Sequence, residues 1–116
     1  MNVLKHILFL LNINFTCTFL HKLYMENPNN TNLLGFSNML RLYGIDTQAG
    51  KITNTETFGN EILPFLTRLD DAFVVVENCK ENIYKLYTDE YTYIEKDAFL
   101  EKWDGTFLAF EKTQYS

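Results

Sequence analysis

The hydrophobic pattern of this chain changes at Gly44, and that change limits the folds open to it. Before Gly44, apolar residues recur at steps of three and four, a spacing typical of helices with one buried face. After Gly44, short runs rich in β-branched and aromatic residues are separated by polar turns, which is typical of antiparallel strands. A chain with its helices first and its strands later is expected to form an α+β domain.

Local signals set the expected element boundaries. Residues 3–11 are expected to form a short apolar helix, a second helix to start at a cap on Asn14 or Thr16, and a third to run from a cap on Asn32 to Gly44. Strands are expected at residues 47–53 (an edge strand), 64–69, 73–76, 83–87, 91–94 and 106–110 (the closing strand), with a short helix at 96–103. Of these segments, about five are expected to form an antiparallel sheet. The segment ETFGNEI (56–62) is expected to be a turn or a short helical stretch, and ENCKEN (77–82) to be the loop of a hairpin.

Composition narrows the function classes. The 116 residues suffice for one domain, and 47% apolar content with 16% aromatic content indicates an ordered core. With a net charge of −5 and scattered lysines and arginines, there is no basic stripe to follow a nucleic acid. Two cysteines are too few for a disulfide scaffold, and two histidines without a ligand cluster predict no metal and no cofactor. The apolar run Ile7–Leu11 is too short for a signal peptide or a membrane span.

Cys17 is the one residue whose position suits a nucleophile. It lies at the expected start of a helix, where aligned peptide dipoles stabilise a thiolate. His21 is one helical turn away, but two side chains at this spacing on one helix leave little room for a substrate. The simpler interpretation is a small residue in a helical first turn. Cys79 is expected to lie in the hairpin loop, exposed to solvent.

Tyrosines recur along the expected strands at 84, 87, 91 and 93. They either cover a face of the sheet or line a peptide groove, since tyrosine offers apolar area with a polar tip. Both interpretations remain open at this point. The carboxylates of Asp70 and Asp71 are expected to belong to a solvated turn, because neither burial nor mutual repulsion is available there to separate their pKa values.

The stretches LPFLTRLDDAFVVV (63–76) and KDAFLEKWDGTFLAFE (96–111) together resemble the C-terminal half of the bacteriocin-processing cysteine peptidases, family C thirty-nine. These are papain-like domains found at the N-terminus of peptide-exporting ABC transporters. Phe99, Trp103 and Gly105 match the Phe-x-x-x-Trp-x-Gly ending of that family. TCTFLHKLY (16–24) and NLLGFSNMLRLYGID (32–46) are similar to its nucleophile helix and the helix that follows. The chain is also similar to a degenerate branch fused ahead of vitamin K epoxide reductase-like and thioredoxin-like segments of bacterial membrane proteins.

The resemblance implies that Cys17 holds the position of the nucleophile and that Ala72 holds the position of the general-base histidine. A methyl group accepts no proton, so the expected base is missing. The family's oxyanion-hole glutamine has no match either, because Leu10, Leu11 and Asn12 stand near its place. Asp89 is close to an expected aspartate, but the proline that should follow it is absent.

These observations lead to one main interpretation with two alternatives. Residues 1–116 are expected to form a single papain-like domain, part of a longer chain, with Trp103 buried against the sheet. It is expected to lack peptidase activity and to bind a peptide or protein segment through Tyr84, Tyr87 and Tyr91. The resemblance implies transporter or redox domains of the same longer chain as partners, and a location on the cytoplasmic side, tethered to the membrane. The alternatives are a thiol enzyme that uses Cys17, as a peptidase or a redox thiol, and a purely structural spacer.

Overall fold

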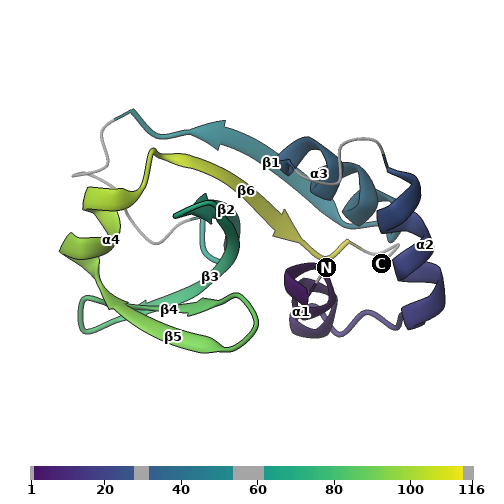
Figure 1. Cartoon of the computed structure of the whole chain (residues 1–116), viewed down its shortest axis with the longest axis horizontal. Coiled ribbons are helices and arrows are strands. Elements are labelled where there is room, and N and C mark those ends of the chain that lie inside the picture. The colour runs from purple at the N-terminus through teal and green to yellow at the C-terminus, as the bar shows by residue number, and fades with distance from the viewer. Residues whose placement is uncertain (1, 28–31, 54–61, 114–116) are drawn as a thin grey trace. The chain divides into compact units, whose positions relative to one another are not determined.

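The computed structural model describes residues 2–27, 32–53 and 62–113 (Figure 1). The chain divides into two compact units, Met1–Thr47 with Phe110–Ser116 and Gln48–Ala109. The first unit contains the three N-terminal helices, and the second contains most of the sheet and one further helix.

The helices of the first unit are α1 (Asn2–Leu10), α2 (Cys17–Glu26) and α3 (Leu33–Leu42). Side chains cap two of them as predicted: Thr16 Oγ1 accepts a hydrogen bond from the Phe19 amide at 3.3 Å, and Asn32 Oδ1 accepts one from the Gly35 amide at 3.0 Å. Gly44 follows α3 with a φ of 79°, a left-handed conformation that glycine adopts without strain. The predicted start and end signals of these helices are therefore confirmed.

The apolar faces of these helices are buried, as their spacing predicts. The enclosed side chains are Leu4, Ile7 and Leu8 of α1, Leu20 of α2, and Phe36, Met39 and Leu40 of α3. Polar contacts hold the segment after α3: the Thr47 hydroxyl lies 2.7 Å from that of Ser37 and accepts a hydrogen bond from Arg41 Nε at 2.9 Å. Thr113 Oγ1 donates a hydrogen bond of 2.6 Å to the Gly44 carbonyl, so the chain's C-terminal segment returns to the end of α3.

A six-stranded sheet with the order β1-β6-β2-β3-β4-β5 forms the second half of the fold (Figure 1). Its strands are β1 (Asp46–Lys51), β2 (Phe65–Leu69), β3 (Ala72–Lys80), β4 (Ile83–Tyr87), β5 (Tyr91–Glu95) and β6 (Thr106–Glu111). Helix α4 (Lys96–Lys102) lies between β5 and β6 in the chain. Neighbouring strands pair antiparallel from β6 through β2, β3 and β4 to β5. The predicted edge strand is confirmed as β1, and the sheet has six strands instead of about five. Most of the ETFGNEI segment lies outside the described residues.

Two tight turns connect β2 to β3 and β3 to β4. Asp70 and Asp71 form the first with φ of 50° and 63°, and Glu81 and Asn82 form the second with φ of 54° and 63°. Two successive positive φ angles suit a two-residue hairpin turn, whose twist matches that of the flanking strands. Because two residues complete the second turn, the polar residues before it stay in β3. The prediction that Cys79 lies in an exposed loop is therefore wrong: it is half-buried on β3, opposite Tyr84.

The core of the second unit lies on the face of the sheet that α4 covers. It contains Phe65, Leu69, Val74, Val76, Tyr84, Leu86, Phe99 and Trp103. The Trp103 ring stacks on Phe65 at 5.4 Å between ring centroids and lies 5.3 Å from Phe99. Its Nε1 donates to Thr67 Oγ1 at 3.0 Å and to the Thr106 carbonyl at 2.8 Å, so this buried ring has its polar atom satisfied. The predicted burial of Trp103 is confirmed. None of the helices in the described residues has the length and hydropathy needed to cross a membrane.

Candidate functional site

Cys17 is the first residue of α2, directly after the Thr16 cap. Its side chain is exposed and its thiol is free. The first turn of α2 holds no acidic residue that would oppose a thiolate. His21, one turn further along the same helix, is also exposed, while Leu20 between them points into the protein. The predicted position of Cys17 at a helix start is confirmed, and the structure shows in addition that the residue is exposed to solvent.

Ala72 begins β3, pairs with Leu69 across the hairpin, and is exposed. The turn before it carries Asp70 and Asp71, whose carboxylates are both exposed. Lys102 Nζ lies 2.9 Å from Asp70, and Arg68 lies 3.8 Å from Asp71. The two aspartates thus form a solvated turn with cationic neighbours, as expected.

The chain's two histidines both occur within its first 21 residues. His6 is buried in α1, where its ring stacks on Phe9 at 6.3 Å between centroids, and His21 lies on α2. The sheet therefore carries no histidine of this chain. Cys17 belongs to the first unit and Ala72 to the second.

The tyrosines predicted as binding residues lie on two different faces of the sheet. Tyr84 is fully buried and packs on Phe99 at 4.8 Å between ring centroids, so for this residue the core interpretation holds. Burial, and secondarily the charge of Cys79, raises the pKa of Tyr84 to about 12. The tyrosines lie on different faces because side chains alternate along a strand. Tyr84 and Tyr87 are three residues apart on β4 and therefore face opposite sides of the sheet.

Tyr87 and Tyr91 lie directly opposite each other on β4 and β5, on the face away from the core. Their rings meet edge to face at 5.2 Å between centroids. Lys85 Nζ lies 4.2 Å from the centre of the Tyr91 ring, and the Tyr91 hydroxyl donates to Glu77 Oε1 at 3.4 Å. Burial, then the charge of Glu77 and its hydrogen bond, raises the pKa of Tyr91. Whether these tyrosines contact a ligand stays a prediction.

The register of β4 and β5 extends this surface beyond the residues predicted from sequence. Three cross-strand pairs share the face: Ile83 with Glu95, Lys85 with Tyr93, and Tyr87 with Tyr91. We call these six residues the outer face. Tyr93 is 67% exposed, Tyr91 42% and Ile83 41%. The alternation of residues 83, 85 and 87 in the sequence is the signal that would have found them.

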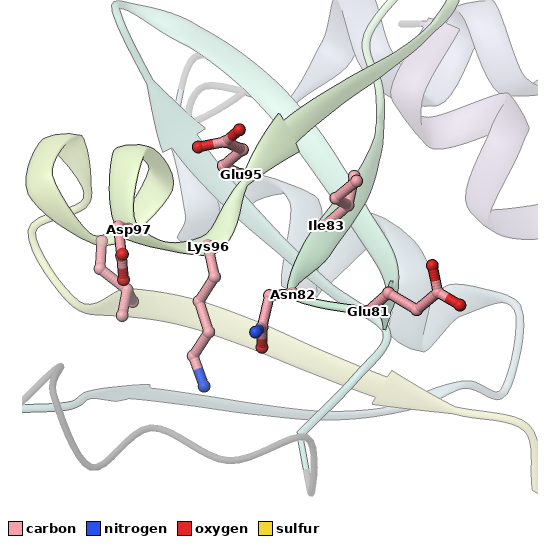
Figure 2. Close-up of a pocket in the computed structure, with 7 residues that line it drawn as sticks. Glu81, Asn82, Ile83, Glu95, Lys96 and Asp97 are labelled. Atoms are coloured by element: carbon pink, nitrogen blue, oxygen red, sulfur yellow. The ribbon is translucent and has the colours of Figure 1, made fainter.

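A pocket of about 580 Å³ lies where this hairpin joins α4 (Figure 2). It is lined by Glu81, Asn82, Ile83, Glu95, Lys96, Asp97 and Leu100. No single sequence motif predicts it, because its walls come from a turn, two strands and a helix. Among the described residues, no group of three or more histidine, cysteine or acidic side chains could hold a metal ion.

The sequence matches the family model described as the Peptidase C39 family over residues 1–115. No curated protein sequence matches the chain. Among solved structures, the peptidase domain of Streptococcus ComA, a bifunctional ABC transporter of a quorum-sensing pathway, is similar with a TM-score of 0.76 at 18% identity. That match covers 96% of this chain and 88% of the ComA domain.

Two other solved structures share the fold. A double glycine motif protease from an AMS/PCAT transporter, in complex with the leader peptide, has a TM-score of 0.63 at 21% identity and covers 71% of this chain and 61% of that one. The N-terminal peptidase C39-like domain of a Vibrio parahaemolyticus toxin secretion ATP-binding protein has a TM-score of 0.57 at 15% identity, covering 71% and 70%. The predicted papain-like α+β fold is confirmed by these matches. The chain belongs to the peptidase C39 family.

Proposed function

We infer that this chain is a C39 peptidase-like domain that binds a peptide segment without cleaving it. The observation that carries this proposal is the alanine at position 72, together with the lack of any histidine after His21. A thiol peptidase needs a base within hydrogen-bond reach of its sulfur, and such a base is typically worth about 10²- to 10⁴-fold in rate. Ala72 supplies only a methyl group where the family resemblance implies the base.

The residues before Cys17 also support the proposal. A developing oxyanion needs donors aimed at it, and the loss of one such donor costs about 10²- to 10³-fold. Where the resemblance implies a glutamine amide, this chain has Leu10, Leu11 and Asn12. A free thiol that lacks both a base and this donor retains little power to cleave an amide.

A peptide is the proposed ligand because a solved structure with the same fold holds a leader peptide. The half-buried Tyr87 and the exposed Tyr91 offer apolar area with polar tips for such a chain. The ligand would be presented by a transporter or redox domain of the same longer polypeptide, on the cytoplasmic side of a membrane.

A thiol enzyme is the second candidate, and the exposure of Cys17 at a helix start favours it. A synthetic double-glycine leader peptide labelled with fluorescein separates the two. Anisotropy should show saturable binding, and mass spectrometry should show no cleavage by the wild-type chain or by Ala72→His, since that variant still lacks the oxyanion donor. Cleavage that disappears in Cys17→Ser would establish the enzyme instead. A lack of both binding and cleavage would favour a structural spacer.

A further inference from the structure

The strand β5 is the last strand of the sheet within the described part of the chain. Two backbone hydrogen bonds at the ends of the β4–β5 hairpin fix which of its groups point outward. The Thr88 amide donates to the Glu90 carbonyl at 3.3 Å, and the Lys96 amide donates to the Asn82 carbonyl at 2.8 Å. Because bonded and non-bonded pairs alternate along an antiparallel ladder, both bonds place Tyr93 in a non-bonded pair.

Residues in non-bonded pairs turn their backbone groups away from the partner strand. The amide and carbonyl of Tyr93 and the amide of Glu95 therefore point from β4 toward the outer edge of the sheet. Such an edge is a template for one more strand, and added strands are a recurring mode of peptide recognition. The side chains of the same two residues lie on the outer face, so a strand added here would run beside the exposed aromatic rings.

The pocket described above continues the outer face at one end. Ile83 and Glu95 are the last pair of that face and also line the pocket. Figure 2 shows their side chains on one side of the two strands, with Asn82 and Lys96 extending to the other side. A chain laid along β5 past Tyr93 would thus reach a pocket of about 580 Å³, large enough for a long side chain.

The charges of the pocket walls indicate which kind of ligand would bind there. The pocket walls carry three carboxylates, from Glu81, Glu95 and Asp97, against one ammonium group from Lys96. A second copy of this chain, paired edge to edge through β5, would present Tyr91–Glu95, which contains no lysine or arginine and so brings no cation to the acidic pocket. A segment that carries a lysine or arginine would instead gain a favourable partner.

We propose that the outer edge of β5, at Tyr93 and Glu95, binds an extended peptide whose apolar side chains pack on the outer face and whose basic side chain enters the pocket. This inference rests on the proposed function in taking a peptide as the ligand, and it specifies the site and the ligand's chemistry. In an antiparallel alignment the basic residue lies near the amino end of the peptide, because β5 runs toward the pocket.

The probe is a seven-residue peptide in which threonine and valine alternate after a lysine at the second position. Its first matched partner has glutamate in place of lysine. The second matched peptide carries N-methyl groups on alternate amides. It is made in two versions, one with the odd-numbered amides methylated and one with the even-numbered amides methylated, and these are the two phases of N-methylation. NMR titration with the full chain should shift the Tyr93 and Glu95 amides and slow their hydrogen exchange with the lysine peptide. One phase of N-methylation should abolish these effects, because it removes the donors of the added strand.

A charge swap supplies the second readout. Glu95→Lys should weaken the lysine peptide about three- to tenfold and strengthen the glutamate peptide, with both effects reduced by salt. Glu101→Lys, on the exposed surface of α4 outside the pocket, is the matched control. It should change the affinities for the lysine peptide and for the glutamate peptide only slightly, and by the same factor.

Each other result overturns the proposal. Binding that shifts neither the Tyr93 nor the Glu95 amide, or that N-methylation leaves unchanged in both phases, places the peptide elsewhere. Protection of these amides without peptide, together with a doubled mass in sedimentation, would assign the edge to a second copy. If the double-glycine leader peptide binds while the Tyr93 and Glu95 amides stay unshifted, the proposed function stands and this site fails. If neither peptide binds, both fail.

Discussion

Trp103 should be a principal stabilising residue of the second unit. Its ring is 4% exposed and lies between Phe65 and Phe99, with centroid distances of 5.4 and 5.3 Å. Truncation to alanine removes this area and leaves a cavity, so Trp103→Ala should lower the free energy of unfolding by about 3–5 kcal/mol. Two aromatic pairs at about 0.5–1.5 kcal/mol each are part of that loss.

Trp103→Phe separates the ring from its hydrogen bonds. Phenylalanine keeps most of the stacked area but loses Nε1, which donates to Thr67 Oγ1 and to the Thr106 carbonyl. The Thr67 hydroxyl still donates to that carbonyl at 2.7 Å, so one acceptor stays satisfied. The expected cost is about 1–2 kcal/mol, below the cost of alanine.

Urea unfolding followed by far-ultraviolet circular dichroism measures both variants, because Trp103 is the chain's single tryptophan and its fluorescence is lost with it. Tyr93→Ala, at a side chain 67% exposed, is the control and should stay within about 0.5 kcal/mol of the wild type. A loss below about 1 kcal/mol for Trp103→Ala would refute the reasoning, since it would mean that the ring is not part of a packed core.

Three further substitutions test other parts of the structure by the same unfolding assay. Burial raises the pKa of Tyr84 from 10.0 to about 12, so the unfolded chain loses this proton first and stability should fall by about 2–3 kcal/mol between pH 10 and pH 12; Tyr84→Phe should remove that fall. Hydrogen bonds from Thr106 lower the pKa of Asp104 from 3.8, so Asp104→Asn should cost under about 1 kcal/mol at neutral pH, a difference that should vanish as acid protonates the carboxyl. Gly105 has a φ of 92°, and a Cβ there would collide with the Ile52 carbonyl, so Gly105→Ala should cost about 2 kcal/mol or more, and an unchanged urea midpoint would contradict this close approach.

The helix boundaries were predictable because their causes are local. Thr16 and Asn32 cap helices through bonds to residues three positions on, and Gly44 ends a helix through its own backbone angle. Each signal lies within a few residues of its effect. The burial of Trp103 was predictable as well, because it follows Phe99 by four residues, and although α4 ends at Lys102 the two side chains still share the core.

The sequence-based predictions are wrong where the length of a turn, or the alternation of side chains along a strand, decides where a residue lies. The polar neighbours of Cys79 predict a loop, whereas a two-residue turn at Glu81 and Asn82 keeps it on β3. Residue type alone predicts one role for Tyr84 and Tyr87, whereas their odd spacing on one strand places them on opposite faces. In both cases the backbone geometry decides where the side chain lies, and polarity and residue type do not encode it.

The candidate site was only partly predictable. The position of Cys17 at a helix start follows from the Thr16 cap, and the lack of histidine after His21 is read directly from the sequence. The outer face required the register of β4 and β5, which depends on how the three-residue connection after Tyr87 closes. The pocket required the junction of that hairpin with α4, and no local pattern encodes a junction of separate elements.

The rate at which iodoacetamide alkylates Cys17 at pH 6 tests the central claim most directly. Peptide mapping by mass spectrometry distinguishes this thiol from Cys79, and the same chain unfolded in urea gives the reference rate. A thiol without a base should react within about threefold of the reference, because the thiolate is the reactive form. A folded-state rate about 100-fold above the reference would reveal an activated nucleophile and contradict the account.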